Sequence, residues 1–280
     1  MTAKEDFSGQ LVHLVNQLKS HVSTDDGQWT VKGFIDIFRN VYTISSDTKI
    51  VSKVLEIHLF PQIMAFAQTA GYKIVLAEHQ NYYPDISFVK SDDDSIRFAV
   101  DFKTTYRSPK KPHLCNGFTL GSHGEYFTNR TSRKNIQFPY SSYSGHFCLG
   151  IIYDRADGVA IDETRIHPVD ELKAITSVVK NFEFFITEKW KIASDKRGSG
   201  NTANIGSIKN IADIVDGRGM FSKLGESWFD DYWMNYGKIT TKGKKGATRK
   251  ITRLADFVKY RKGDVSLIVP TSNEDGVEEA

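Results

Sequence analysis

The sequence predicts a mixed fold, α/β or α+β, with a mixed central β-sheet. Helix-spaced apolar residues occupy the N-terminal region, and apolar runs of strand length recur from residue 72 to residue 187. The helices and strands do not alternate regularly and no internal repeat is visible, which argues against a simple parallel βαβ array. The 280 residues are enough for one large domain or for a core with a smaller lobe.

The N-terminal part is expected to contain two helices. Residues 5–20 are amphipathic, with Leu11, Leu14, Val15 and Leu18 at helical spacing. A turn over 21–33 then leads into a short apolar segment at 34–38.

A second helix is expected to begin at Ser46 or Asp47, since either side chain can cap it. Pro61 is expected to end or kink this helix, and Gly71 to end the helical stretch that follows. Its apolar face is expected to carry Ile50, Val54 and Ile57, and its polar side Lys49, Lys53 and Glu56.

Strands are expected from residue 72 onward. Residues 86–90 and 96–104 flank the acidic turn 91–95, which predicts a hairpin. Glycines and polar residues fill 108–133, the stretch 197–207 has the composition of a loop, and the remainder is expected to be helical with breaks at Gly237 and Gly243. The other expected strands are 72–77, 146–153 and 182–187.

Charge is unevenly distributed although the net charge is only +3. Ten Lys or Arg residues and one acid, Asp256, lie between Lys238 and Lys262, and five acids without a base follow from Asp264 to Ala280. The basic stretch fits either a solvated helix surface or a surface that contacts phosphates.

Cys115 and Cys148 lie far apart and lack the spacing of metal ligands. They fit a reducing compartment, and Cys148 has the surroundings of a small core residue. The N-terminus has no apolar signal core, and no segment is expected to approach the roughly 20 apolar residues of a membrane span. A cytoplasmic protein is therefore expected.

Two acidic residues and a lysine form the most informative local pattern. Alternate side chains of a strand share a face, so Asp101 and Lys103 point one way while Val100 and Phe102 point into the core. Pairing of 85–90 with 96–103 would place Asp85 beside Asp101. Two carboxylates suit Mg²⁺, which can activate water against a phosphodiester, and the lysine ammonium can stabilise the attacked phosphate.

Taken singly, these residues also fit less specific interpretations. An Asp-x-Lys pair is often a surface ion pair on a half-exposed strand. Glu56 lies three residues after Lys53, a spacing that suits a helix-surface ion pair. The run Asp92–Asp94 could bind a metal, although a solvated hairpin turn explains it as well.

Several segments, in order, resemble the EcoRV-like type II restriction endonucleases of the PD-(D/E)xK nuclease superfamily. The resemblance covers most of residues 40–236. It rests on SDTKIVSKVLEI at 46–57, HQNYYPD at 79–85, FAVDFKTTY at 98–106, FTLG at 118–121, KNIQFPY at 134–140, EKWKIASDKRGSGNTANIGSI at 188–208 and FDDYWMNY at 229–236.

The resemblance implies roles for individual residues. It makes Asp85 and Asp101 metal-binding carboxylates, Lys103 the catalytic lysine, and Glu56 a further acidic residue of the metal and catalytic site. The recognition loop that reads bases in the major groove would be Gly198, Ser199, Gly200, Asn201 and Thr202. Glycines permit close backbone approach to base edges and an Asn amide can pair with adenine. The further DNA-binding residues would be Gln80, Asn81, Lys134, Thr104, Thr105 and Thr119.

The resemblance also implies an α/β restriction-endonuclease-like core with helices flanking the sheet and an N-terminal dimerisation region. A single endonuclease domain is expected over 1–265, with dimer contacts mainly in the N-terminal third, a recognition loop at 197–207, and a disordered acidic tail at 266–280. A homodimer would bind double-stranded DNA at a palindrome, with one active site for each strand. Mg²⁺-activated water would cut GATATC bluntly, leaving 5′-phosphate and 3′-hydroxyl ends. A DNA methyltransferase would protect host DNA without being a stable subunit, and no membrane would be involved.

The chain departs from this pattern in four places. Ala203 replaces a threonine, the segment between Gly121 and Lys134 is about two residues longer, the N-terminus is longer, and the acidic tail has no counterpart. Two other functions also fit the sequence. One is a structure-selective repair or recombination nuclease, and the other is a DNA-binding protein without catalysis.

Overall fold

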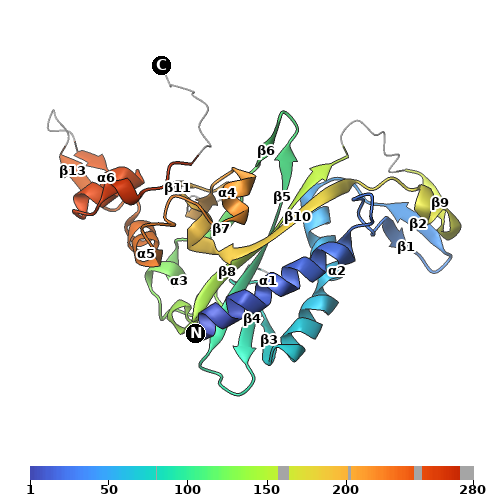
Figure 1. The fold of residues 1–280 in the computed structure, drawn as a ribbon, viewed down its shortest axis with the longest axis horizontal. Coiled ribbons are helices and arrows are strands. Elements are labelled where there is room, and N and C mark those ends of the chain that lie inside the picture. The colour runs from blue at the N-terminus through green and yellow to red at the C-terminus, as the bar shows by residue number, and fades with distance from the viewer. Residues whose placement is uncertain (80, 157–163, 201–202, 243–247, 272–280) are drawn as a thin grey trace.

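The computed structural model describes residues 1–79, 81–156, 164–200, 203–242 and 248–271. It has the expected α/β architecture, a mixed central sheet flanked by helices (Figure 1). Within the described ranges the main sheet joins six strands in the order β10-β8-β5-β4-β3, with β6 paired to β5. These strands are β3 (Tyr72–Leu76), β4 (Ile86–Lys90), β5 (Arg97–Ser108), β6 (Lys111–Cys115), β8 (Gly145–Arg155) and β10 (Val179–Glu188).

The sheet is mixed because β5 and β8 run parallel, whereas its other pairs are antiparallel. β4 and β5 form the hairpin expected from the acidic turn, with Ile86 opposite Val100. Smaller sheets contain β1 (Gly33–Ile35), β2 (Asn40–Thr43), β7 (Thr119–Ser122), β9 (Ile166–Pro168), β11 (Ala193–Arg197), β12 (Asn204–Ser207), β13 (Thr240–Lys242) and β14 (Thr248–Lys250).

The remaining elements are helical. The long helices are α1 (Ala3–Val22) and α2 (Thr48–Thr69). The short ones are α3 (Glu125–Thr128), α4 (Ile211–Val215), α5 (Glu226–Asn235), α6 (Leu254–Tyr260) and the 3₁₀ helices η1 (Tyr140–Ser142), η2 (Val169–Ala174), η3 (Lys189–Ile192) and η4 (Val265–Leu267). In Figure 1, β1, β2 and β9 lie at one end of the molecule, and α5, α6 and β13 at the opposite end.

Hydrophobic clusters lie on both faces of the main sheet in the described residues. One includes Phe98, Val100 and Phe102 of β5 together with the buried sides of α1 and α2. The other includes Ala99 and Cys148 together with residues of β7, β12, α5 and α6. Val100 and Phe102 therefore lie on the core side, as expected. Both cysteines are free and buried.

Helix α2 departs from the expectation in two respects. Asp47 caps it as expected. Pro61 was expected to end or kink the helix, and it does not end it, because the helix runs on to Thr69 with Leu59 and Ile63 buried on either side of the proline. Its buried face was assigned wrongly in part: Val54 is buried as expected, but Ile50 and Ile57 are exposed. The buried residues are Val51, Val54, Leu55, Leu59, Ile63 and Ala67.

By length and composition α2 is apolar enough to cross a membrane, with a mean hydropathy of 1.3, contrary to the expectation that no segment approaches a span. Its buried residues pack in the core beneath the sheet, and a core helix of a soluble protein passes the same test. The helix is therefore weak evidence for a membrane.

Two predictions for the C-terminal part of the chain were wrong in part, namely the loop over 197–207 and the helical region after 236. Residues 204–207 form β12 rather than loop, because Gly206 lets β12 lie close against β11: a Cβ there would stand 2.6 Å from the Lys196 carbonyl oxygen. The region after 236, expected to be helical, contains the β13–β14 hairpin before α6. The polar segment 108–133 likewise contains β6, β7 and α3.

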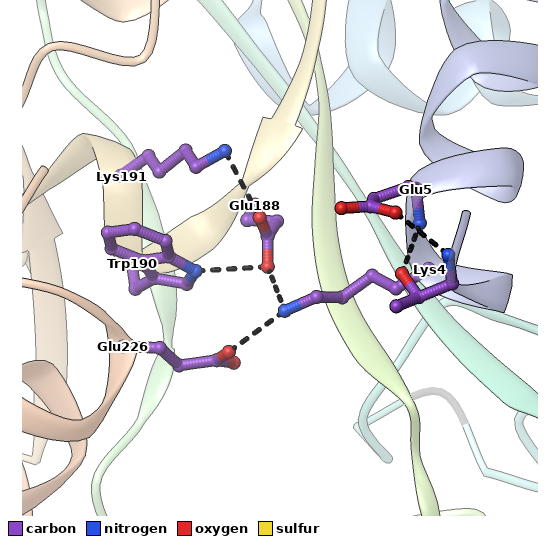
Figure 2. A network of polar contacts seen from close by, with 7 residues as sticks. Lys4, Glu5, Glu188, Trp190, Lys191 and Glu226 are labelled. Atoms are coloured by element: carbon purple, nitrogen blue, oxygen red, sulfur yellow. Dashed lines mark hydrogen bonds and ion pairs between the residues drawn. The ribbon is translucent and has the colours of Figure 1, made fainter.

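The N-terminal helix α1 is tied to two distant segments. Thr2 and Glu5 cap its start with reciprocal hydrogen bonds. The Lys4 ammonium lies 2.7 Å from a Glu188 carboxylate oxygen and 3.1 Å from one of Glu226, so it joins α1 to the end of β10 and to α5 (Figure 2).

Candidate active site

A cleft of about 880 Å³ is lined by residues of β5, of β7 and of the segment before β4. Asp85, Asp101 and Lys103 line it, as do Asn81, Thr104, Thr105, Thr119, Lys134 and Ser199. The cleft therefore brings together residues expected to act on the phosphate and residues expected to contact DNA, from segments more than 100 positions apart.

The acidic pair sits where the expected hairpin places it. Asp101 and Lys103 alternate along β5, and their carboxylate oxygen and ammonium nitrogen are 2.5 Å apart. Asp85 lies directly before β4, where its carboxylate accepts a hydrogen bond of 2.7 Å from the Phe102 backbone N–H. The hairpin register thus draws Asp85 against the strand that carries the other two residues.

The electrostatics of this group follow from burial and mutual repulsion. Burial raises the pKa of Asp85 to about 7, with the Asp101 carboxylate adding to the rise and Lys103 opposing it. Burial alone would lower the pKa of Lys103, but the carboxylates of Asp101 and Asp85 outweigh it and hold that pKa above its ordinary value. Repelling carboxylates in a largely buried position make a bound cation favourable, and their hard oxygens fit Mg²⁺.

Glu56 is not brought into this cleft. Its carboxylate forms an ion pair of 2.8 Å with Lys53 one helical turn earlier. Among the described residues no three acidic, histidine or cysteine side chains are grouped closely enough to hold a metal ion. The geometry of Glu56 therefore fits the helix-surface ion pair, although Lys53 also feels the charge of Asp85.

The expected recognition loop connects β11 to β12 beside the cleft. Gly200 has a φ of +86°, which a glycine adopts without strain. The Ser199 carbonyl accepts a hydrogen bond of 2.6 Å from the Asn204 amide, and the Ala203 carbonyl accepts one of 2.8 Å from the His123 backbone N–H. Gly198 lies in the same loop, whereas Asn201, Thr202 and Gln80 fall outside the described residues.

Sequence reasoning missed other residues of the cleft wall. Tyr83 directly precedes the Pro84–Asp85 pair and lines the cleft with Tyr126. The others are Thr48, Tyr82, Tyr106, Asn116, Gly117, Phe118, Gly121, Ser122, Gly124, Glu125, Asn135, Ala203 and Asn204. Tyr83 could have been found from its place next to Asp85, but the other segments meet only through tertiary packing.

A buried lysine behind this wall was also missed. Lys189 is 3% exposed, and burial lowers the pKa of its ammonium from 10.5 to about 8. The charged groups that act on it come from β5, α5 and the segment after α3; they are Asp101, Asp230 and Glu226, which raise this pKa, and Arg130, which lowers it.

This burial predicts a pH-dependent stability difference. A lysine with a depressed pKa in the folded state destabilises the fold fully below that pKa, and the penalty disappears as pH rises toward the unfolded value. Lys189→Met removes this penalty, so its free energy of unfolding should exceed that of the unaltered protein below about pH 8. The difference should shrink between about pH 8 and pH 10, by up to about 3 kcal/mol in total. Urea unfolding of both proteins across this range measures it, and a constant difference would contradict it.

Comparison with known proteins agrees with this geometry. Residues 25–262 match the family described as restriction endonuclease EcoRV. Over 217 residues the chain is 35% identical to the type II restriction enzyme EcoRV of Escherichia coli, a span of 77% of this chain and 86% of that enzyme. The chain therefore belongs to the EcoRV family and is a type II restriction endonuclease.

Proposed function

We propose that the protein is a Mg²⁺-dependent homodimer that hydrolyses both strands of a palindromic DNA duplex, GATATC, with a blunt cut. The ends would be a 5′-phosphate and a 3′-hydroxyl. One observation carries the proposal: Asp85, Asp101 and Lys103 share a single cleft with Ser199 of the loop between β11 and β12. A scissile phosphate and base edges of one duplex can then be engaged together.

In the proposed mechanism Asp85 and Asp101 hold the cation. Bound Mg²⁺ would polarise a phosphoryl oxygen and lower the pKa of a water molecule. The Lys103 ammonium donates hydrogen bonds to the attacked phosphate and stabilises its developing negative charge. Lys134, Thr104, Thr105, Thr119 and Asn81 would contact the DNA around the scissile bond, since all lie along the cleft. Glu56 would join the metal and catalytic site as a further acidic residue only if its ion pair with Lys53 breaks.

The homodimer is supported by exposed apolar side chains near the N-terminus. Phe34 and Ile35 of β1 are 53% and 60% exposed, and Ile37 and Phe38 of the following turn are 90% and 76% exposed. Such a patch on a soluble protein marks an interaction site, and a palindromic target calls for a second copy.

The dimer proposal predicts an effect of Ile37→Glu. Burying a carboxylate in the interface should weaken dimerisation by about 100-fold or more, without unfolding a subunit in which residue 37 is exposed. Sedimentation measures the dimer, with the exposed Val12→Glu of α1 as control. Dimerisation of Ile37→Glu at the unaltered strength would show that the interface lies elsewhere.

The target site is tested by incubating the protein and Mg²⁺ with plasmids that differ only in one GATATC sequence. The proposal expects one cut in the plasmid with the site and none in its partner. Cutting at junctions or at random would favour a structure-selective nuclease. Binding without any cleavage would favour a non-catalytic DNA-binding protein, and would contradict the proposal.

The other expectations stay proposals. They are a cytoplasmic location, a separate DNA methyltransferase, one endonuclease domain over 1–265 and an acidic tail at 266–280, of which 272–280 lies outside the described residues. In the basic stretch, Arg249, Arg253 and Arg261 each lie within 4.0 Å of an acidic oxygen. These pairs favour the solvated-surface interpretation for those arginines.

A further inference from the structure

A lysine ammonium is enclosed by aromatic rings behind the cleft wall. The Lys189 Nζ lies 4.5 Å from the centre of the Tyr83 ring, 4.8 Å from that of Tyr140 and 5.6 Å from that of Phe127. Within the described part of the chain this buried nitrogen has no hydrogen-bond partner. The ring faces are thus the groups that stabilise its charge at close range.

The backbone that carries Lys189 is firmly anchored. Glu188, the preceding residue, accepts hydrogen bonds from Lys4 at 2.7 Å and from the Trp190 indole at 3.0 Å, and pairs with Lys191 at 3.1 Å (Figure 2). These contacts fix the turn from β10 into η3. Lys189 therefore follows a residue whose side chain is tied to α1 and to η3.

The ring nearest the ammonium belongs to the segment that delivers Asp85. Tyr83 lines the cleft, and two residues later Asp85 bonds the backbone of β5. The Tyr83 hydroxyl lies 3.0 Å from the His146 Nδ1, and its ring stacks on Tyr126 with centroids 5.4 Å apart. Tyr83 thus contacts the buried ammonium and also lines the cleft of the candidate active site.

The burial of this charge has a stability penalty. An ammonium without a hydrogen-bond partner is expensive to bury, whereas an apolar side chain of the same length would fill the cage without that penalty. Packing alone therefore does not account for a lysine here. The attraction between its charge and the Tyr83 ring, in contrast, restrains the segment that carries a metal-binding carboxylate.

We propose that Lys189 is a positioning residue of this endonuclease, acting through the face of the Tyr83 ring to hold the Tyr83–Asp85 segment in its active geometry. The inference rests on the proposed function of Asp85. It assigns no contact between Lys189 and DNA or the metal.

The test uses Lys189→Met, which keeps the side-chain length and removes the charge. We expect the single-turnover cleavage rate at GATATC with Mg²⁺ to fall about tenfold or more, since fixing a reacting group contributes at least this much. Metal-free binding of the same duplex should be unchanged, and the fold at neutral pH should be at least as stable. The control is Lys223→Met, which removes the charge of an exposed lysine that takes no part in these contacts and should leave cleavage unchanged.

Two further variants test whether Lys189 acts on the site through the Tyr83 ring. Tyr83→Leu should lower the rate as Lys189→Met does, and the double variant should be no slower than the slower single one. Tyr83→Phe keeps the ring face and should restore most of the activity. Cleavage by Lys189→Met at the unaltered rate, additive effects in the double variant, or a loss of DNA binding equal to the loss of rate would each overturn the inference. Failure of the unaltered protein to cut would overturn the proposed function instead.

Discussion

Asp101→Ala is expected to abolish metal-dependent cleavage while site-specific DNA binding persists. The substitution removes one of the two carboxylates that face each other in the cleft and leaves the Lys103 ammonium without its partner at 2.5 Å. Loss of a metal ligand removes the stabilisation of the transition-state charge, so the rate should fall by about 1,000-fold or more. Binding should survive because the loop between β11 and β12 is untouched.

The measurement pairs single-turnover cleavage with metal-free binding to the same duplex. Asp92→Ala is the control, because Asp92 lies in the exposed β4–β5 turn and its loss should change neither quantity. This control also tests whether the acidic turn binds the metal. Cleavage that persists in Asp101→Ala would contradict the site, and cleavage lost in Asp92→Ala would move the metal to the turn.

Phe7→Ala is expected to destabilise the whole fold. Phe7 is fully buried, its ring stacks on Phe98 at 4.2 Å, and it also contacts Tyr72 and Phe88. Truncating such a ring costs about 3–5 kcal/mol of unfolding free energy. The effect matters for function because Phe98 belongs to β5, the strand that carries Asp101 and Lys103.

Urea unfolding measures this loss directly. Val12→Ala, on the exposed side of the same helix, should change stability by less than about 0.5 kcal/mol. Helix α1 precedes residues 25–262, which match the family, so the result shows whether the helix is integral to this chain's core. A Phe7→Ala protein as stable as the control would mean that α1 is dispensable.

Five of the six strands of the main sheet could be predicted from the sequence, because they are apolar runs or lie in a hairpin. Strand β6 was missed, because its sequence Lys-Pro-His-Leu-Cys is polar and mostly exposed. The acidic turn after β4 set the register that brings Asp85 to Asp101. Local pattern was ambiguous in α2, where apolar residues cover both sides and the exposed Ile57 resembles the buried Leu55. Strand β12 was missed because its short Asn-Ile-Gly-Ser sequence becomes a strand only through pairing with β7 and β11.

Some residues of the candidate site could also be predicted from the sequence, and others could not. Asp85, Asp101 and Lys103 follow from strand alternation and one hairpin, so local rules reach them. Lys189 was not predicted, because the sequence Glu-Lys-Trp-Lys gives no sign of which lysine is buried. Its place is decided by rings from Tyr83, Phe127 and Tyr140, which meet only in the folded chain.

The most direct test of the central claim is to sequence the ends produced from a defined DNA library by the protein with Mg²⁺. The account predicts blunt ends at the centre of GATATC, with 5′-phosphates, and no cleavage when Asp101→Ala replaces the unaltered protein. Ends scattered without a common sequence, or no cleavage of any DNA by the unaltered protein, would contradict it.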